Sequence, residues 1–334
     1  MSSTPQDDPN QNNDDMSDLG KYKRVEIIGE GAYGVVYKGI NTETGEQVAI
    51  KKIRLHECST SEGVPRAVVR EVGLLKELSE SPFIVSLLSV IGYRGRLLLV
   101  FEFLSYDLKT YMDERTDPKT GLRLPEISAR SLSSQLLSGV KHCHARRVIH
   151  RDLKPHNILV STDGRVKIAD FGLARLTSLP NRPYTREVVT LWYRSPEILL
   201  GCLEYGMSVD CWSCGCVIGE IVTGRPLFTG QSEIDQIIKI MRVMGTPDDG
   251  VWEGVEKMPY WQDRFPKFAK LDIEKTNGLG GRPKEVVEGL LRMNPRKRLS
   301  AHDALKEKWF TETSSDIHRT VTYDEGIEEQ QKGT

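Results

Sequence analysis

Val148-Ile149-His150-Arg151-Asp152-Leu153-Lys154-Pro155-His156-Asn157 is the most informative stretch of this chain. It sets a carboxylate and an amide five positions apart, on either side of a lysine. The pattern H-R-D-L-x-x-x-N is typical of a loop that transfers a phosphoryl group. Such a group carries charge on several oxygens, so its transfer depends on positioning and electrostatic stabilisation. The interpretation therefore requires phosphate-binding and magnesium-binding residues elsewhere in the chain.

A glycine-rich segment lies upstream of this loop. Its pattern, G-x-G-x-x-G-x-V, is made by Gly29, Gly31, Gly34 and Val36. The missing Cβ atoms would let backbone N–H groups approach phosphates, but the same spacing also occurs in dinucleotide-binding folds and in plain turns. Alternating β-branched residues flank the glycines at 25–28 and 35–38. We therefore predict that they join two strands, whereas the dinucleotide motif opens a helix.

A lysine follows at the end of the apolar strand Val48-Ala49-Ile50-Lys51 and could reach the α and β phosphates of ATP. An isolated lysine in such a place is more often a solvated edge residue. Pro65 is predicted to open a helix whose apolar positions recur every three or four residues, at Val68, Val69, Val72, Leu75 and Leu78. Because Glu71 lies close to that packed face, we predict an ion pair between Lys51 and Glu71.

Downstream of the loop, residues 166–172 are predicted to form a short strand followed by Asp170-Phe171-Gly172. Alone, this tripeptide is an ordinary turn. It comes soon after Asn157, however, and Asp170 and Asn157 together are the predicted magnesium ligands. Asp152 would accept or orient the proton of the attacking hydroxyl, and Lys154 would balance charge on the γ-phosphate.

With these motifs in order, the chain resembles the eukaryotic protein kinases, and residues 22–310 most resemble the cyclin-dependent kinase family. The signature helix of that family, PSTAIRE, corresponds to PRAVVRE at 65–71, where only Pro, Arg and Glu coincide. Residues 184–197 are similar to the activation segment, with Tyr184-Thr185 where mitogen-activated kinases have Thr-x-Tyr. The resemblance implies an α+β, bilobal protein kinase fold. Its small N-lobe would be mainly β with one key helix, and its larger C-lobe mainly α.

Composition agrees with this interpretation. We expect a disordered acidic tail at 1–21, the N-lobe at 22–104, the C-lobe at 105–310 and a polar tail at 311–334. The 334 residues are 38% hydrophobic, enough for a sizeable core, and 46 basic against 47 acidic residues give a net charge of −1. So small a net charge produces no strong electrostatic field of one sign around the protein, and the composition therefore does not indicate nucleic-acid or membrane binding. The first 20 residues have no apolar core, so we expect no signal peptide and a soluble protein of nucleus and cytoplasm.

The resemblance implies control by a cyclin and by an activating kinase. In the family, the threonine that matches Thr185 is phosphorylated and held by three arginines, here Arg70, Arg151 and Arg175. A phosphate adds roughly −1.5 to −2 charge and three strong acceptors, although these arginines could instead pair with surface carboxylates. The family also has a Thr-Tyr pair of inhibitory sites in the glycine loop. This chain has Ala32-Tyr33, which leaves Tyr33 as the single expected inhibitory site.

The resemblance further implies ATP and Mg²⁺ as cofactors. Adenine would lie against Ile28, Val36 and Ala49 and bond to the backbone of Glu102 and Leu104. Phe101 would be the gatekeeper and Asp107 the ribose contact, although residues 97–104 equally resemble a buried strand. The glycine loop supplies the remaining nucleotide-binding positions, Gly29, Glu30, Gly31, Ala32, Tyr33, Gly34 and Val35.

Substrate choice is expected to follow from residues 188–194. In the family, Arg194 binds a backbone carbonyl near Val189, which leaves the residue after the target hydroxyl without an acceptor. An ordinary residue would bury an unpaired N–H there at a cost of about 1–3 kcal/mol, whereas proline has no N–H. We therefore expect protein substrates with Ser/Thr-Pro sites, contacted by Val188, Val189, Trp192 and Arg194.

The resemblance also implies residues with structural roles. Ser195 replaces the Ala of the family's A-P-E and should leave Glu197 free to pair with Arg298, as in the family, and the residue that matches Asp210 lies beneath the catalytic loop there. Three of the six cysteines cluster at Cys211, Cys214 and Cys216, which we interpret as thiols of a buried helix at 209–222 and not as zinc ligands. His142 and His144 are likewise interpreted as helix residues.

Two alternative functions remain open. One is a cyclin-dependent kinase that acts in transcription and not in the cell cycle. The other is a kinase-fold scaffold with weak catalysis. Scaffolds of that kind usually lack the lysine, the catalytic aspartate or the magnesium aspartate, whereas Lys51, Asp152 and Asp170 are all present here.

Overall fold

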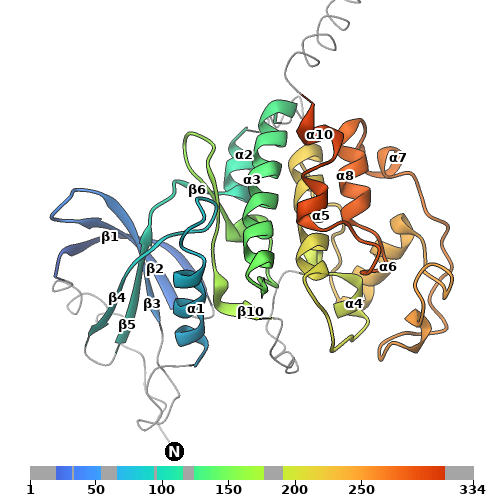
Figure 1. Cartoon of the computed structure of the whole chain (residues 1–334), viewed down its shortest axis with the longest axis horizontal. Coiled ribbons are helices and arrows are strands. Elements are labelled where there is room, and N and C mark those ends of the chain that lie inside the picture. The colour runs from blue at the N-terminus through green and yellow to red at the C-terminus, as the bar shows by residue number, and fades with distance from the viewer. Residues whose placement is uncertain are drawn as a thin grey trace, which may run out of the picture. The chain divides into compact units, whose positions relative to one another are not determined.

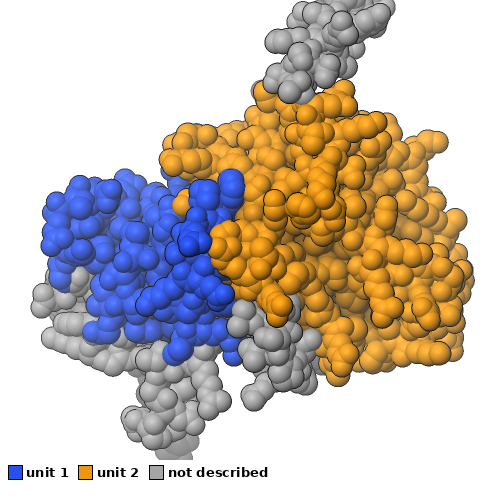
Figure 2. All heavy atoms as spheres, viewed as in Figure 1, with its two compact units in different colours: residues 1–105 blue, residues 106–334 orange. Residues whose placement is uncertain are grey.

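A computed structural model gives the structure of the chain and describes residues 20–31, 34–53, 66–93, 96–115, 124–176 and 191–312. The chain forms two compact units, residues 1–105 and residues 106–334, which Figure 2 shows in two colours. Residues 1–19 and 313–334, in the two predicted tails, lie outside the described residues. Within the described part, no helix is both long and apolar enough to cross a membrane.

Unit 1 is built on a five-stranded antiparallel sheet in the order β1-β2-β3-β5-β4 (Figure 1). The strands are β1 (Tyr22–Gly31), β2 (Gly34–Asn41), β3 (Gln47–Ile53), β4 (Leu87–Tyr93) and β5 (Arg96–Glu102). The glycine-rich segment joins two strands, as predicted, because β1 and β2 pair up to Gly31 and Gly34. A Cβ on Gly34 would overlap the backbone oxygen of Lys52 in β3, so the close approach of these strands requires glycine.

The one described helix of unit 1, α1 (Arg66–Glu77), packs on the sheet through Val68, which lies in a cluster with Ile53 and Leu99. Successive side chains of a strand point to opposite faces, so Lys51 lies on the same face of β3 as Ile53. The predicted packed stripe of α1 is wrong at Val69, which is 60% exposed, while Leu74 is buried. At 100° per residue, 68, 71, 75 and 78 share a face and 69 turns away from it.

Unit 2 is mainly helical. Its central helix is α5 (Ser208–Thr223), which is buried at nearly every position and contacts α3 (Glu126–Ala145) and α8 (Arg282–Leu290). The predicted buried helix at 209–222 is thus confirmed, and its cysteines are buried free thiols. Other helices are α2 (Leu108–Arg115), α4 (Pro196–Leu199), α6 (Glu233–Met244), α7 (Ile273–Asn277), α9 (Ala301–Ala304) and α10 (Lys308–Thr311).

Two small sheets in unit 2 carry the loops of interest. One pairs β7 (Val148–Ile149) with β10 (Arg175–Leu176), and the other has the order β6-β8-β9. The strands of the second are β6 (Tyr106–Asp107), β8 (Ile158–Val160) and β9 (Val166–Ile168). The stretch 150–157 therefore begins where β7 ends and finishes where β8 begins. An antiparallel sheet in unit 1 and a helical unit 2 agree with the predicted α+β fold.

Candidate active site

Unit 1 holds the predicted ion pair. Lys51 Nζ lies 2.9 Å from Glu71 Oε1, and the two side chains are only 14% and 5% exposed. β3 supplies the lysine and α1 supplies the carboxylate, so the pair ties the helix to the sheet. Burial limits screening by solvent and salt, and the bond orients an ammonium group on the sheet face that α1 covers.

The predicted adenine contacts lie on β1, β2 and β3, at the end of β5 and, for Leu104, two residues beyond that strand. Ile28 is 46% exposed, which leaves apolar surface that a flat base could cover. The backbone N–H of Glu102 donates to the oxygen of Ser86 at 3.1 Å, and its carboxylate accepts from the N–H of Ser86 at 2.6 Å. Since that N–H is engaged, it is not the group of Glu102 that would bond adenine.

In unit 2, the loop after β7 brings three predicted residues together. Asp152 Oδ2 accepts hydrogen bonds from Lys154 Nζ at 2.8 Å and from Asn157 Nδ2 at 2.9 Å. Asn157 Nδ2 also donates to the backbone oxygen of Asp152 at 2.8 Å. The carboxylate is thus held by one cationic and one neutral donor, in a fixed orientation suited to receiving a proton.

The predicted magnesium ligands follow from the pairing of β8 with β9. Ile158 pairs with Ile168, and the N–H of Ala169 donates to the oxygen of Asn157 at 2.9 Å, so the two strand ends lie together. Asp170 has a left-handed backbone, with φ of 61°. The amide nitrogen of Asn157 points to Asp152, which leaves its carbonyl oxygen for a cation. A carboxylate and an amide oxygen form a donor set that Mg²⁺ accepts.

A buried carboxylate on α5 supports this loop. Asp210 accepts hydrogen bonds from the backbone N–H groups of His150 and Arg151, both at 2.8 Å, as predicted for its place beneath the loop. Arg151 has φ of 72°, a conformation that costs energy for a residue with a side chain, so its bond to Asp210 helps to hold it. His150 Nε2 lies 2.9 Å from the oxygen of Ala169, which links the loop to the Asp170 segment.

His144 has a larger role than the predicted one. It is a residue of α3, but its Nε2 lies 3.0 Å from Asp210 Oδ2. Burial alone would lower the pKa of His144, yet the hydrogen bond to Asp210 raises it from 6.5 to about 9. Burial opposes ionisation of Asp210 in turn, but the bond and charge of His144 leave the pKa of that carboxyl below its usual value. The two groups therefore form an ion pair at neutral pH.

This pair predicts a specific pH dependence of stability. A histidine whose pKa is raised by folding stabilises fully below its unfolded pKa, and that stabilisation is lost as pH rises through the folded pKa. From pH 6.5 to pH 9 the free energy of unfolding is expected to fall by about 3 kcal/mol through this group. Urea unfolding of wild type and His144→Gln at several pH values checks this. The amide nitrogen of glutamine takes the place of the Nε2 that contacts Asp210 but does not titrate, so equal slopes in both proteins would contradict the prediction.

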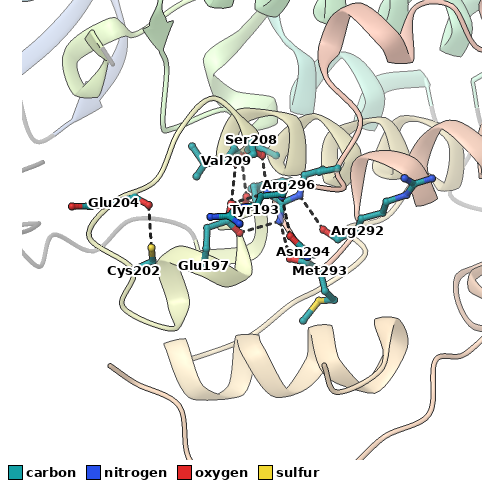
Figure 3. Close-up of polar contacts among 12 residues, drawn as sticks. Tyr193, Glu197, Cys202, Glu204, Ser208, Val209, Arg292, Met293, Asn294 and Arg296 are labelled. Carbon is teal, nitrogen blue, oxygen red and sulfur yellow. Dashed lines mark hydrogen bonds and ion pairs between the residues drawn. The ribbon is translucent and has the colours of Figure 1, made fainter. Parts of the chain in front are cut away.

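A second buried ion pair joins α4 to the segment after α8. Figure 3 labels Glu197, its acidic member. Arg298 Nη1 and Nη2 donate to the two carboxylate oxygens of Glu197 at 2.7 and 3.0 Å, which confirms the predicted pair. The remaining donors of the guanidinium reach backbone oxygens of Ser208, Met293 and Arg292. Both side chains are almost fully buried, at 0% and 2% exposed. The pair therefore anchors three chain segments at one point.

The described part of the predicted substrate segment is residues 191–194. Arg194 Nη1 pairs with Glu233 Oε1 of α6 at 2.9 Å, and Tyr193 OH donates to Glu220 Oε2 of α5 at 2.6 Å. Burial raises the pKa of both Tyr193 and Glu220. The contacts of Glu233 and Glu220 with this segment were not predicted, because neither glutamate belongs to a motif.

Other predicted residues have contacts of their own or lie outside the described part of the chain. Asp107, the predicted ribose contact, accepts bonds at 2.9 Å from both the N–H and the hydroxyl of Thr110 at the start of α2. Arg70 lies on α1 in unit 1, whereas Arg151 lies in unit 2. The predictions for Pro65, Ala32, Tyr33, Thr185, Val188, Val189 and the side chain of Arg175 lie outside the described residues.

Comparison with known proteins adds two findings. The family model described as "Protein kinase domain" matches residues 22–310. The chain is also 47% identical, over 295 residues, to a protein of Trypanosoma brucei brucei named "Cell division control protein 2 homolog 3". That similarity covers 87% of this chain and 92% of the relative, so it includes both units.

Proposed function

This chain belongs to the protein kinase family and is of the cyclin-dependent kinase type, and from this premise we propose that it is a proline-directed serine/threonine kinase. We propose further that a cyclin and phosphorylation of Thr185 activate it. The observation that carries the catalytic part is the carboxylate of Asp152, held between Lys154 and Asn157. A role in cell division rests on the similarity to the trypanosome protein.

In the proposed mechanism, the hydroxyl of the substrate attacks the γ-phosphorus of ATP while Asp152 orients the hydroxyl and accepts its proton. The bond between the γ-phosphorus and the β–γ bridging oxygen breaks, and ADP leaves with that oxygen. Lys154 offsets the negative charge of the γ-phosphate next to that carboxylate. Lys51, oriented by Glu71, binds phosphate oxygens. Asn157 and Asp170 would hold Mg²⁺, which neutralises phosphate charge when bound. Protein kinases in general use ATP and Mg²⁺, and these residues supply donors of the required chemistry.

Regulation would act through the same loop. A phosphate on Thr185 that binds the guanidinium of Arg151 would restrain the residue that precedes Asp152. The backbone of Arg151 is already bonded to Asp210, so the phosphate would complete the support of a strained residue. On α1, the exposed Val69 offers an apolar side chain to a cyclin. We propose Tyr33 as an inhibitory site and a location in nucleus and cytoplasm, on family resemblance alone.

A peptide phosphorylation assay tests the proposal. Initial rates are measured on a Ser-Pro peptide and on its Ser-Ala counterpart, using the chain alone, the chain with its copurified cyclin, and that complex phosphorylated on Thr185. We expect a higher kcat/KM for the Ser-Pro peptide and full activity only in the phosphorylated complex. Equal use of both peptides would contradict the substrate proposal. A full rate from the unphosphorylated chain alone would contradict the regulatory one.

A further inference from the structure

The first turn of α6 closes a ring of hydrogen bonds around the backbone of the substrate segment. Gln236 is completely buried, at 0% exposed. Its Nε2 donates to the oxygen of Trp192 at 3.1 Å, and its Oε1 accepts from the N–H of Gly230 at 2.6 Å. The indole N–H of Trp192 donates to the oxygen of Gly230 at 3.1 Å. One amide side chain therefore fixes both the carbonyl of Trp192 and the loop on which its ring is anchored.

The loop before α6 is itself held in place. The N–H of Asp235 donates to the hydroxyl of Ser232 at 3.1 Å, and the carboxylate of Asp235 accepts from the N–H of Gln231 at 2.9 Å. A Cβ on Gly230 would overlap Gln236, so the loop touches the helix with no room for a side chain. The backbone that receives the indole of Trp192 is thus a rigid part of unit 2.

A second residue of the same turn, Glu233, contacts the substrate segment two positions after Trp192. Glu233 pairs with the guanidinium of Arg194, whose side chain is 16% exposed. Helix α6 therefore contacts Trp192 through Gln236 and Arg194 through Glu233. Neither glutamine nor glutamate is among the residues expected to touch ATP, magnesium or the reacting hydroxyl.

We infer that Gln236 and Glu233 are positioning residues that set the preference for the residue after the target hydroxyl. This inference rests on the proposed function and on the arrangement that the family resemblance implies. In that arrangement, Arg194 binds the backbone carbonyl that would otherwise accept the N–H of the residue after the target hydroxyl. Arg194 can exclude a substrate N–H only while its guanidinium is correctly placed. Gln236 fixes the main chain at Trp192, two residues before Arg194, and Glu233 orients the side chain of Arg194. Loosening either contact is expected to relax discrimination between proline and other residues.

The chemistry of the site explains why position 236 holds an amide. The side chain must donate to a carbonyl and accept from an N–H at the same time, and glutamine does both. A glutamate of almost the same shape would direct a carboxylate oxygen at the carbonyl of Trp192, in a position that is completely buried. Gln236→Glu is therefore the most informative substitution, because it reverses one contact and changes little volume.

The test compares kcat/KM for a Ser-Pro peptide with kcat/KM for a Ser-Ala peptide in the full-length chain with its activating partner. The ratio of the two values does not depend on the fraction of enzyme that is active, so a merely destabilising variant leaves it unchanged. We expect Gln236→Glu to lower the ratio about tenfold, with KM for ATP unaltered. Glu233→Gln, whose side chain is more exposed, is expected to lower it less.

Lys239→Met is the matched control. Lys239 lies on the same helix and donates to the oxygen of Thr229, so it holds the same loop without touching Trp192 or Arg194. Its ratio should equal that of wild type. Equal losses on both peptides in Gln236→Glu, with the ratio intact, would overturn the inference and leave Gln236 a residue of the fold only. If Gln236→Glu does not fold, an unchanged ratio in Glu233→Gln overturns it.

The proposed function fails in a distinguishable way. If wild type itself uses both peptides equally, the proline preference is wrong whatever the variants do. The positioning role is then judged from KM for the peptide against KM for ATP. A rise in peptide KM alone in Gln236→Glu supports positioning of the segment, and unchanged peptide KM contradicts it.

Discussion

Replacing Asp152 with asparagine is expected to lower kcat by at least about 100-fold while ATP still binds. Asparagine has the same shape and keeps an oxygen that can accept from Lys154 and Asn157, which bond Asp152 at 2.8 and 2.9 Å. It lacks the negative charge that would receive a proton from the attacking hydroxyl. Single-turnover phosphoryl transfer measures the loss, and calorimetric titration with ATP shows that the nucleotide site survives.

His156→Gln is the control for that experiment. His156 lies on the same loop between Lys154 and Asn157, and it is exposed. Its substitution should leave the rate close to that of wild type, because its side chain has no place in the proposed mechanism. A rate for Asp152→Asn within about tenfold of wild type would contradict the role of Asp152 as proton acceptor.

The largest effect on stability is expected from Arg298→Met. Removing the guanidinium leaves the carboxylate of Glu197 buried without its charged partner and takes donors away from the oxygens of Ser208, Met293 and Arg292. Breaking such a buried pair costs about 3–5 kcal/mol. The loss is measured as the decrease in the free energy of urea unfolding of unit 2, followed by tryptophan fluorescence.

Two further variants test the physical reason. Glu197→Gln combined with Arg298→Met removes the stranded charge, so the double variant should be more stable than Arg298→Met alone. Lys306→Met breaks an exposed pair with Asp303 of 2.8 Å, and it should cost less than about 1 kcal/mol. A similar small loss in Arg298→Met would show that the buried pair does not support unit 2.

The sequence was sufficient for those elements whose signal is local. Alternating residues around the glycines predict the β1-β2 hairpin, and the apolar run at 209–222 predicts α5. The Lys51–Glu71 pair follows from the order of motifs. The error at Val69 has a simple cause, because spacings of three and four residues admit both 68 and 69. Only packing against the sheet decides which of them faces inward.

What the sequence did not predict depends on partners far apart in the chain. His144 meets Asp210 across 66 residues, and Gln236 meets Trp192 across 44. The local sequence around a histidine or glutamine in a helix does not indicate such a partner. From sequence alone, the residue cannot be distinguished from one that faces solvent. These contacts exist only because α3, α5, α6 and the substrate segment are brought together by the fold, which no local pattern encodes.

The distance in sequence between Glu197 and Arg298 also bears on how the protein is made. The two residues are 101 positions apart. At typical rates of translation, the carboxylate is synthesised roughly 5–20 s before the guanidinium that neutralises it. If the nascent unit 2 folded during that interval, it would have to bury the carboxylate of Glu197 without its charged partner. It is therefore expected to stay open on the ribosome until Arg298 has been added.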